Sequence, residues 1–137
     1  MAIEFNKDYI LDKLKYILNV DSPVGFTGNV IKVLQGYIEE LGFKPELTNK
    51  GNLIVTVPGK SNKTVGLSAH VDTLGLIVRG ILSDGTLSFV KLGGPILNTL
   101  DGEYCNIRTR DGRVYTGTIL SNSPAAHVFP DANTLER

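Results

Sequence analysis

The sequence predicts an α/β fold in its first part, followed by a small all-β barrel or sandwich. Apolar residues recur at helical spacing before Gly42, a continuous apolar run covers residues 64–70, and short β runs separated by glycine turns follow Asp72. A chain of 137 residues is long enough to form one ordinary hydrophobic core.

The first helix is expected over residues 7–18, because its apolar side chains fall on one face and Asn6 can cap its start. A second helix is expected after a turn-rich segment at 21–27, with Thr27 as its N-cap and Gly42 as its stop. Both helices are therefore amphipathic, with apolar positions at Ile10, Leu11, Leu14, Ile17 and Leu18 in the first and at Val30, Ile31, Leu34, Ile38 and Leu41 in the second.

Three strands are expected next. Residues 43–48 and 53–57 flank a turn of hairpin composition at 49–52. Residues 64–70 are apolar almost throughout, which is typical of a strand that is covered on both faces. We therefore expect this third strand in the middle of a sheet.

The chain changes character after Asp72, because no helical periodicity occurs again. Turns with the dipeptide Asp-Gly separate the β runs, since glycine adopts positive φ at no steric cost. The boundary between α/β and all-β sequence falls close to Gly75, and the strands are expected at 76–82, 86–90, 103–109 and 114–120.

Composition excludes several function classes. The 14 basic and 14 acidic residues balance, and no basic stripe indicates nucleic-acid binding. No apolar run approaches the roughly 20 residues of a membrane span, and the first residues lack a signal-peptide core. We expect a cytoplasmic protein with no nucleic-acid or membrane partner. The single cysteine, Cys105, is interpreted as a packed thiol.

His70 and Asp72 form the one constellation with evident chemistry. Side chains two residues apart in a strand project from the same face. A neutral imidazole binds a divalent cation, and a carboxylate beside it can hold the other ring nitrogen or bind a cation itself. The pattern indicates a metal site, while a packed or surface histidine at a strand end is the structural alternative.

Longer segments of the sequence carry a family resemblance. Residues 67–78 read LSAHVDTLGLIV, and residues 21–25 read DSPVG. These segments resemble the first metal-ligand segment and an early loop of the M42 family of metalloaminopeptidases, of glutamyl and tetrahedral aminopeptidase type. Further segments at 85–94, 115–118 and 126–128 resemble its inserted β domain. The resemblance extends in order over nearly the whole chain.

The resemblance implies the N-terminal part of a zinc-peptidase α/β sheet domain at 1–74 and a small, barrel-like β insert for oligomerisation, incomplete here, at 75–137. It also implies peptide substrates, a homo-oligomer formed through the insert, and two divalent ions, zinc or cobalt, in each complete site. By position, His70 resembles a metal ligand and Asp72 the catalytic carboxylate that supports it.

The sequence departs from the family in two ways. The family commonly has an acidic residue after Asp72, whereas this sequence has Thr73. The resulting His-Val-Asp-Thr also resembles the M20 peptidases and deacylases. The family's bridging aspartate, paired glutamates, further acidic ligand and late histidine have no counterpart before Arg137. We therefore expect a fragment or a reduced relative, and an isolated chain that is inactive.

Two hypotheses stand beside the aminopeptidase, one on the role of His127 and one on the class of function. His127 is a candidate for reaching the active site of a neighbouring subunit, as a histidine of the insert does in some related enzymes, or it is a structural loop residue. A different class of function is a non-catalytic assembly or binding module, because half a sheet leaves strand edges and an apolar face open.

Overall fold

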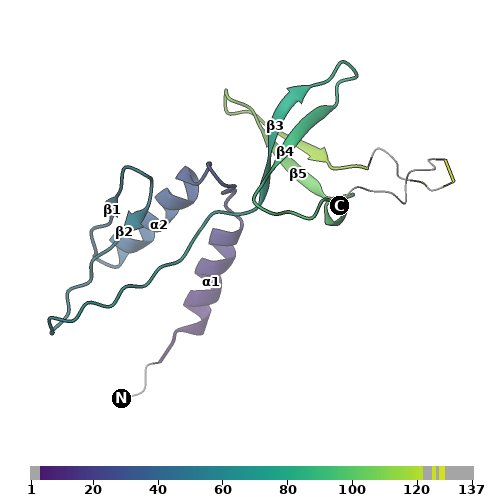
Figure 1. Cartoon of the computed structure of the whole chain (residues 1–137). Coiled ribbons are helices and arrows are strands. Elements are labelled where there is room, and N and C mark those ends of the chain that lie inside the picture. The colour runs from purple at the N-terminus through teal and green to yellow at the C-terminus, as the bar shows by residue number, and fades with distance from the viewer. Residues whose placement is uncertain (1–3, 122–124, 126, 129–137) are drawn as a thin grey trace. The chain divides into compact units, whose positions relative to one another are not determined.

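The computed structural model describes residues 4–121, 125 and 127–128. The chain divides into two compact units, residues 1–93 and 94–137. Figure 1 shows the first unit as two helices, a short hairpin, a long extended segment and a longer hairpin. The proposed domain boundary between residues 74 and 75 stays a prediction.

The two expected helices are confirmed. Helix α1 spans Lys7–Leu18, and the side-chain oxygen of Asn6 accepts a hydrogen bond from the Tyr9 N–H at 3.0 Å, as an N-cap does. Helix α2 spans Gly28–Glu40 and ends before Gly42, whose φ is 81°. Thr27 is the N-cap residue of α2, as predicted, but its backbone is already helical and its side chain makes no capping hydrogen bond.

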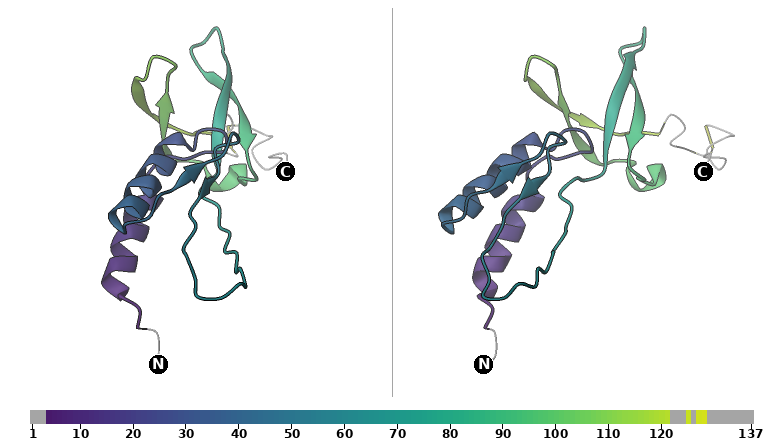
Figure 2. Two further views of the ribbon diagram at one scale, coloured as in Figure 1. Left: turned by 90° about the vertical axis from the view of Figure 1, so that its left-hand side faces the viewer. Right: turned by 60° about the vertical axis from the view of Figure 1, so that its left-hand side comes forward.

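The helices lie side by side (Figure 2) and contact through long side chains. Lys13 Nζ of α1 lies 3.8 Å from the centroid of the Tyr37 ring of α2 and 3.9 Å from the Glu40 carboxylate. Tyr16 meets the same Tyr37 ring edge to face, with centroids 6.3 Å apart. A cation and an aromatic pair thus join the two helices.

The first hairpin is shorter than expected. Strands β1 (Glu46–Leu47) and β2 (Leu53–Ile54) pair antiparallel around a turn that Gly51 closes with a φ of 84°. The hairpin turn thus forms where the sequence predicts it, while the β pairing covers only the residues next to the turn.

The strand predicted at 64–70 is wrong as a regular element. Those residues pair with no strand in the described part of the chain, and Val65 and Leu67 are 83% and 97% exposed. A strand is defined by its hydrogen-bonded neighbours, and residues 4–121 supply none on either side of this segment.

The four later strands occur close to their predicted positions. Strands β3 (Gly75–Ile81) and β4 (Leu87–Leu92) pair antiparallel in the first unit, with a register shift between Val78 and Gly80. In the second unit, η1 (Leu97–Thr99) precedes β5 (Tyr104–Arg108) and β6 (Val114–Thr118), which also pair antiparallel. The described strands form three two-stranded sheets, and the barrel or sandwich stays a prediction.

The described residues bury very few side chains. Val30 is fully buried and Ser22 is 2% exposed, whereas most large apolar residues remain in contact with solvent. Among the helices described, none is long and apolar enough to cross a membrane.

Candidate functional site

The site is built where loop 21–25 meets the segment that carries His70 and Asp72. The Ser22 hydroxyl donates to the Val71 carbonyl at 2.8 Å, and the Thr73 N–H donates to the Ser22 carbonyl at 2.8 Å. Pro23 and Thr73 form an isolated parallel bridge. Two segments about fifty residues apart in sequence are thus joined by backbone and side-chain hydrogen bonds.

Gly75 makes the close approach between these segments possible. A Cβ added at Gly75 would lie 2.5 Å from Pro23 Cβ, a distance that real Cβ atoms essentially never show. The φ of Gly75 is not positive, so its backbone conformation does not require a glycine. The lack of space beside Pro23 does require one.

His70 and Asp72 lie together, as the sequence predicts. His70 Nδ1 is 3.2 Å from the Asp72 carbonyl oxygen and 3.4 Å from Asp72 Oδ1. Both are hydrogen-bond acceptors, so they favour the tautomer with its proton on Nδ1. That tautomer leaves the lone pair on Nε2, the nitrogen that can bind a metal ion.

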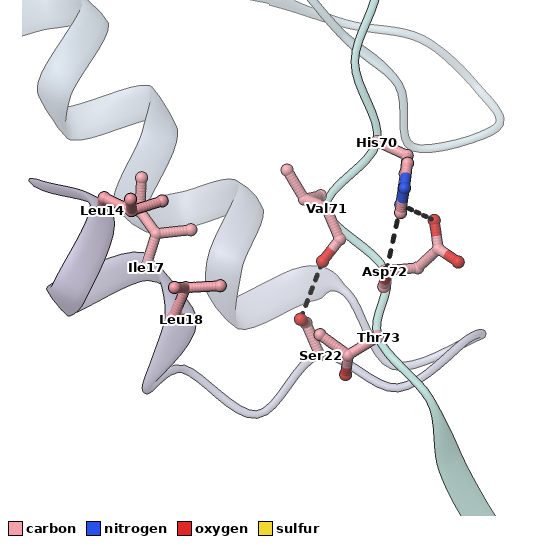
Figure 3. A pocket seen from close by; sticks show the side chains of 8 residues that line it. All are labelled: Leu14, Ile17, Leu18, Ser22, His70, Val71, Asp72 and Thr73. Carbon is pink, nitrogen blue, oxygen red and sulfur yellow. Dashed lines mark hydrogen bonds and ion pairs between the residues drawn. The ribbon is translucent and has the colours of Figure 1, made fainter. Parts of the chain in front are cut away.

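The pair is open to solution. The His70 side chain is 84% exposed and the Asp72 side chain 45% exposed. Both side chains line an open pocket of about 260 Å³. Figure 3 shows apolar residues of α1 across from them. The lining residues are Leu14, Ile17, Leu18, Ser22, His70, Val71, Asp72 and Thr73.

His70 fits one position of a metal site, and the described residues do not complete such a site. No group of three or more His, Cys, Asp or Glu side chains that could hold a metal ion occurs in the part of the chain that the structure describes. Four ligands are usual for a structural zinc ion and three plus water for a catalytic one. The remaining ligands would have to come from other residues.

Two residues considered in the sequence lie elsewhere. His127 is exposed in a turn in the second unit, and the preceding Ala126 lies outside the described residues, so the predicted role of His127 stays a prediction. Cys105 is a partly buried free thiol on β5. Its Sγ would be 3.5 Å from a Cβ at Gly117, so it is a packed residue, as expected.

Ser22 was not a predicted site residue. In the sequence it is one polar residue of a turn-rich segment, without a general base to make it a nucleophile. Its burial and its bond to residue 71 depend on a contact between distant segments, which local sequence patterns do not contain.

Comparison with known proteins gives a consistent result. The family model for M42 glutamyl aminopeptidase matches residues 51–137. Over 128 residues, the chain is 39% identical to YhfE of Bacillus subtilis (strain 168), a presumed aminopeptidase, covering 93% of this chain and 37% of that protein. It is 32% identical over 106 residues to the glutamyl aminopeptidase of Lactococcus lactis subsp. cremoris, covering 76% and 30% of the two chains.

Solved structures agree with this match. The TET aminopeptidase of a marine sediment Thaumarchaeota archaeon is similar with a TM-score of 0.81 at 25% identity, over 97% of this chain and 36% of that one. The dodecamer PhTET1-12s is similar with a TM-score of 0.74 at 28% identity, over 87% and 35% of the two chains. The chain thus spans about a third of the length of these relatives.

Proposed function

Because this chain belongs to the M42 glutamyl aminopeptidase family, we propose that it forms part of a metal-dependent aminopeptidase that removes N-terminal residues from peptides. Its homologues are aminopeptidases, and therefore hydrolases. The observation that carries the proposal is the pairing of His70 Nδ1 with Asp72, which prepares Nε2 as a ligand.

The group implied by this family is a pair of zinc or cobalt ions. When bound, such a pair would supply Lewis-acid polarisation of a scissile carbonyl and activation of water near neutral pH. In this chain, His70 would hold one ion through Nε2. The Asp72 carbonyl and carboxylate would hold the Nδ1 side of the ring, so that Nε2 faces the ion.

The isolated chain is proposed to be inactive. His70 and Asp72 provide one ligand and its support, and the described residues contain no larger group of metal-binding side chains. Catalysis by a metal-activated water needs several protein ligands and a general base. The bridging aspartate, paired glutamates and late histidine of the family would have to be supplied by further polypeptide.

The family also suggests where the protein acts and how it assembles. We assign residues 1–74 to the α/β peptidase domain and 75–137 to a β insert that mediates homo-oligomerisation, in a cytoplasmic enzyme. A dodecameric relative supports an oligomer. Within the insert, His127 is a candidate for acting across the subunit interface, and a structural loop residue is the alternative.

The first experiment compares metal binding by the complete native polypeptide with that of its His70→Gln variant, using Zn²⁺ and Co²⁺ separately. His127→Gln is the matched control for losing an imidazole, because the role proposed for it concerns turnover. We expect His70→Gln to weaken metal binding at least about tenfold and to abolish hydrolysis of an aminoacyl p-nitroanilide. Unchanged binding in His70→Gln would reject the metal-ligand role.

A second function is supported by the exposure of the 64–70 segment. Val65 and Leu67 are almost fully exposed, although apolar side chains in a strand are normally covered. A non-catalytic assembly module would use this surface to pair with another chain. Both functions predict an oligomer in light scattering. Zinc binding and peptide hydrolysis by that oligomer distinguish them, because an assembly module would show neither.

A further inference from the structure

Ser22 is unusual in this chain because it is a buried polar residue among largely exposed neighbours. It is 2% exposed, and both its hydroxyl and its carbonyl contact the segment that carries His70 and Asp72. We infer that Ser22 is a positioning residue, which fixes the backbone at Asp72 and through it the ring of His70. This inference rests on the proposed role of His70 as a metal ligand.

The two hydrogen bonds of Ser22 act on both sides of Asp72. The Val71 carbonyl, which accepts from Ser22 Oγ at 2.8 Å, belongs to the peptide group before Asp72. The Thr73 N–H, which donates to the Ser22 carbonyl at 2.8 Å, belongs to the peptide group after it. The planes of two successive peptide groups define φ and ψ between them. Ser22 therefore sets the direction in which the Asp72 side chain leaves the backbone.

The second of these peptide groups also holds the histidine. Its N–H donates to Ser22, and its carbonyl, which is that of Asp72, lies 3.2 Å from His70 Nδ1. In a trans peptide the N–H and the C=O point in opposite directions, so Ser22 and His70 hold one peptide group from opposite sides. Figure 3 shows Ser22 on the helix side of the segment and the His70 and Asp72 side chains on the other.

Rotation of that peptide group would break both contacts. Without the Ser22 hydroxyl, the peptide group before Asp72 loses its partner, and only the Thr73 N–H bond still ties the residues around Asp72 to Ser22. Asp72 can then rotate about its φ and ψ and carry the second peptide group with it. The Asp72 carbonyl would then turn away from His70 Nδ1 for part of the time. The histidine proton would no longer be confined to Nδ1, and fewer molecules would present an unprotonated Nε2.

The test measures the tautomer of His70 directly, in the metal-free complete polypeptide, from two-bond ¹H–¹⁵N correlations of the imidazole rings. The variants are Ser22→Ala, which removes only the hydroxyl, and Ser22→Thr, which keeps it. Ser88→Ala is the matched control, because the Ser88 hydroxyl also donates to a carbonyl, that of Gly80 at 3.4 Å.

We expect the wild type, Ser22→Thr and Ser88→Ala to show the Nδ1-protonated ring, and Ser22→Ala to show a mixture of tautomers. The affinity of Ser22→Ala for Zn²⁺ should fall between about two- and tenfold, the effect of one hydrogen bond. An unchanged tautomer and affinity in Ser22→Ala would overturn the inference, and so would an equal loss in Ser22→Thr.

Further measurements separate this inference from the proposed function. If the wild type binds no metal, the proposed function fails, and the metal-free tautomer still decides the role of Ser22. If Ser22→Ala does not fold, hydrogen exchange of the wild-type Thr73 N–H decides it. A Thr73 amide that exchanges as fast as an unfolded one shows that loop 21–25 does not hold the segment, whereas slow exchange supports the inference.

Discussion

Pro23 and Gly75 lie so close together that a methyl group on Gly75 would come within 2.5 Å of Pro23 Cβ. The contact joins loop 21–25 to the first residue of β3, just after the candidate site. Two segments that approach this closely have little freedom to adjust, because both atoms belong to or adjoin the backbone.

Gly75→Ala is therefore expected to destabilise the protein by about 1–3 kcal/mol. Gly80→Ala in the same strand is the control, because its added methyl would meet only the Ser88 hydroxyl, at 3.4 Å. Urea unfolding of both variants measures the difference. Equal stabilities would show that loop 21–25 moves away from β3 without cost.

Asn6→Ala is expected to lower the free energy of unfolding by about 1 kcal/mol, because the Tyr9 N–H loses the side-chain oxygen that accepts its hydrogen bond. Thr27→Ala changes the equivalent position of α2, where the side chain makes no such bond, and should have little effect. Thermal unfolding followed by circular dichroism compares the two. A larger loss in Thr27→Ala would contradict the capping assignment.

Lys13→Gln is expected to cost about 0.5–1 kcal/mol of stability, since the ammonium group lies over the Tyr37 ring and near Glu40. Lys15→Gln, in the last turn of the same helix, is the control for loss of a lysine charge. Because the cation–aromatic contact is short, most of the Lys13 effect should persist in 0.5 M NaCl, at which a surface ion pair is largely screened. Complete loss of the effect in salt would assign it to Glu40 alone.

Stability should fall in acid at the two hairpin turns. A backbone hydrogen bond from Thr86 lowers the pKa of Asp84, and a hydrogen bond from the Thr109 side chain lowers the pKa of Asp111. A carboxyl group whose pKa is lower in the folded state stabilises that state above the unfolded pKa, and this contribution is lost as the pH falls through the folded pKa. The loss therefore begins below about pH 4.

Asp84→Asn and Asp111→Asn should each reduce this acid sensitivity. Urea unfolding at pH 5 and at pH 2.5 measures how the free energy of unfolding depends on pH. Asp101→Asn is the control for removing a carboxylate beside a glycine. If the double variant Asp84→Asn, Asp111→Asn loses as much stability in acid as the wild type, these two carboxylates do not account for it.

The parts of the fold that follow from the sequence are those fixed by neighbours in the chain. The extent of α1 matches its periodicity and its Asn6 cap, and Gly42 and Gly51 adopt the positive φ that their positions required. The pairing of His70 with Asp72 also depends on residues only two apart. Local patterns contain this information, because one or two turns of chain determine it.

The parts that were missed depend on distant partners. An apolar run at 64–70 indicates a strand, but pairing needs neighbours that the described residues do not provide. The contacts of Ser22 with Val71 and Thr73 join segments separated by about fifty residues, and no spacing rule reveals them. Thr27 occupies the N-cap position of α2, yet its backbone is helical and its side chain makes no capping hydrogen bond.

The extended segment at 64–70 also bears on solubility. It contains no proline and no acidic or basic residue apart from His70, it includes the β-branched Thr64 and Val65, and Leu67 is 97% exposed. Short stretches of this kind add to copies of themselves edge to edge and precipitate when nothing shields them. The segment that leads into the candidate site at His70 therefore sets an upper limit on the concentration at which the bare chain stays in solution.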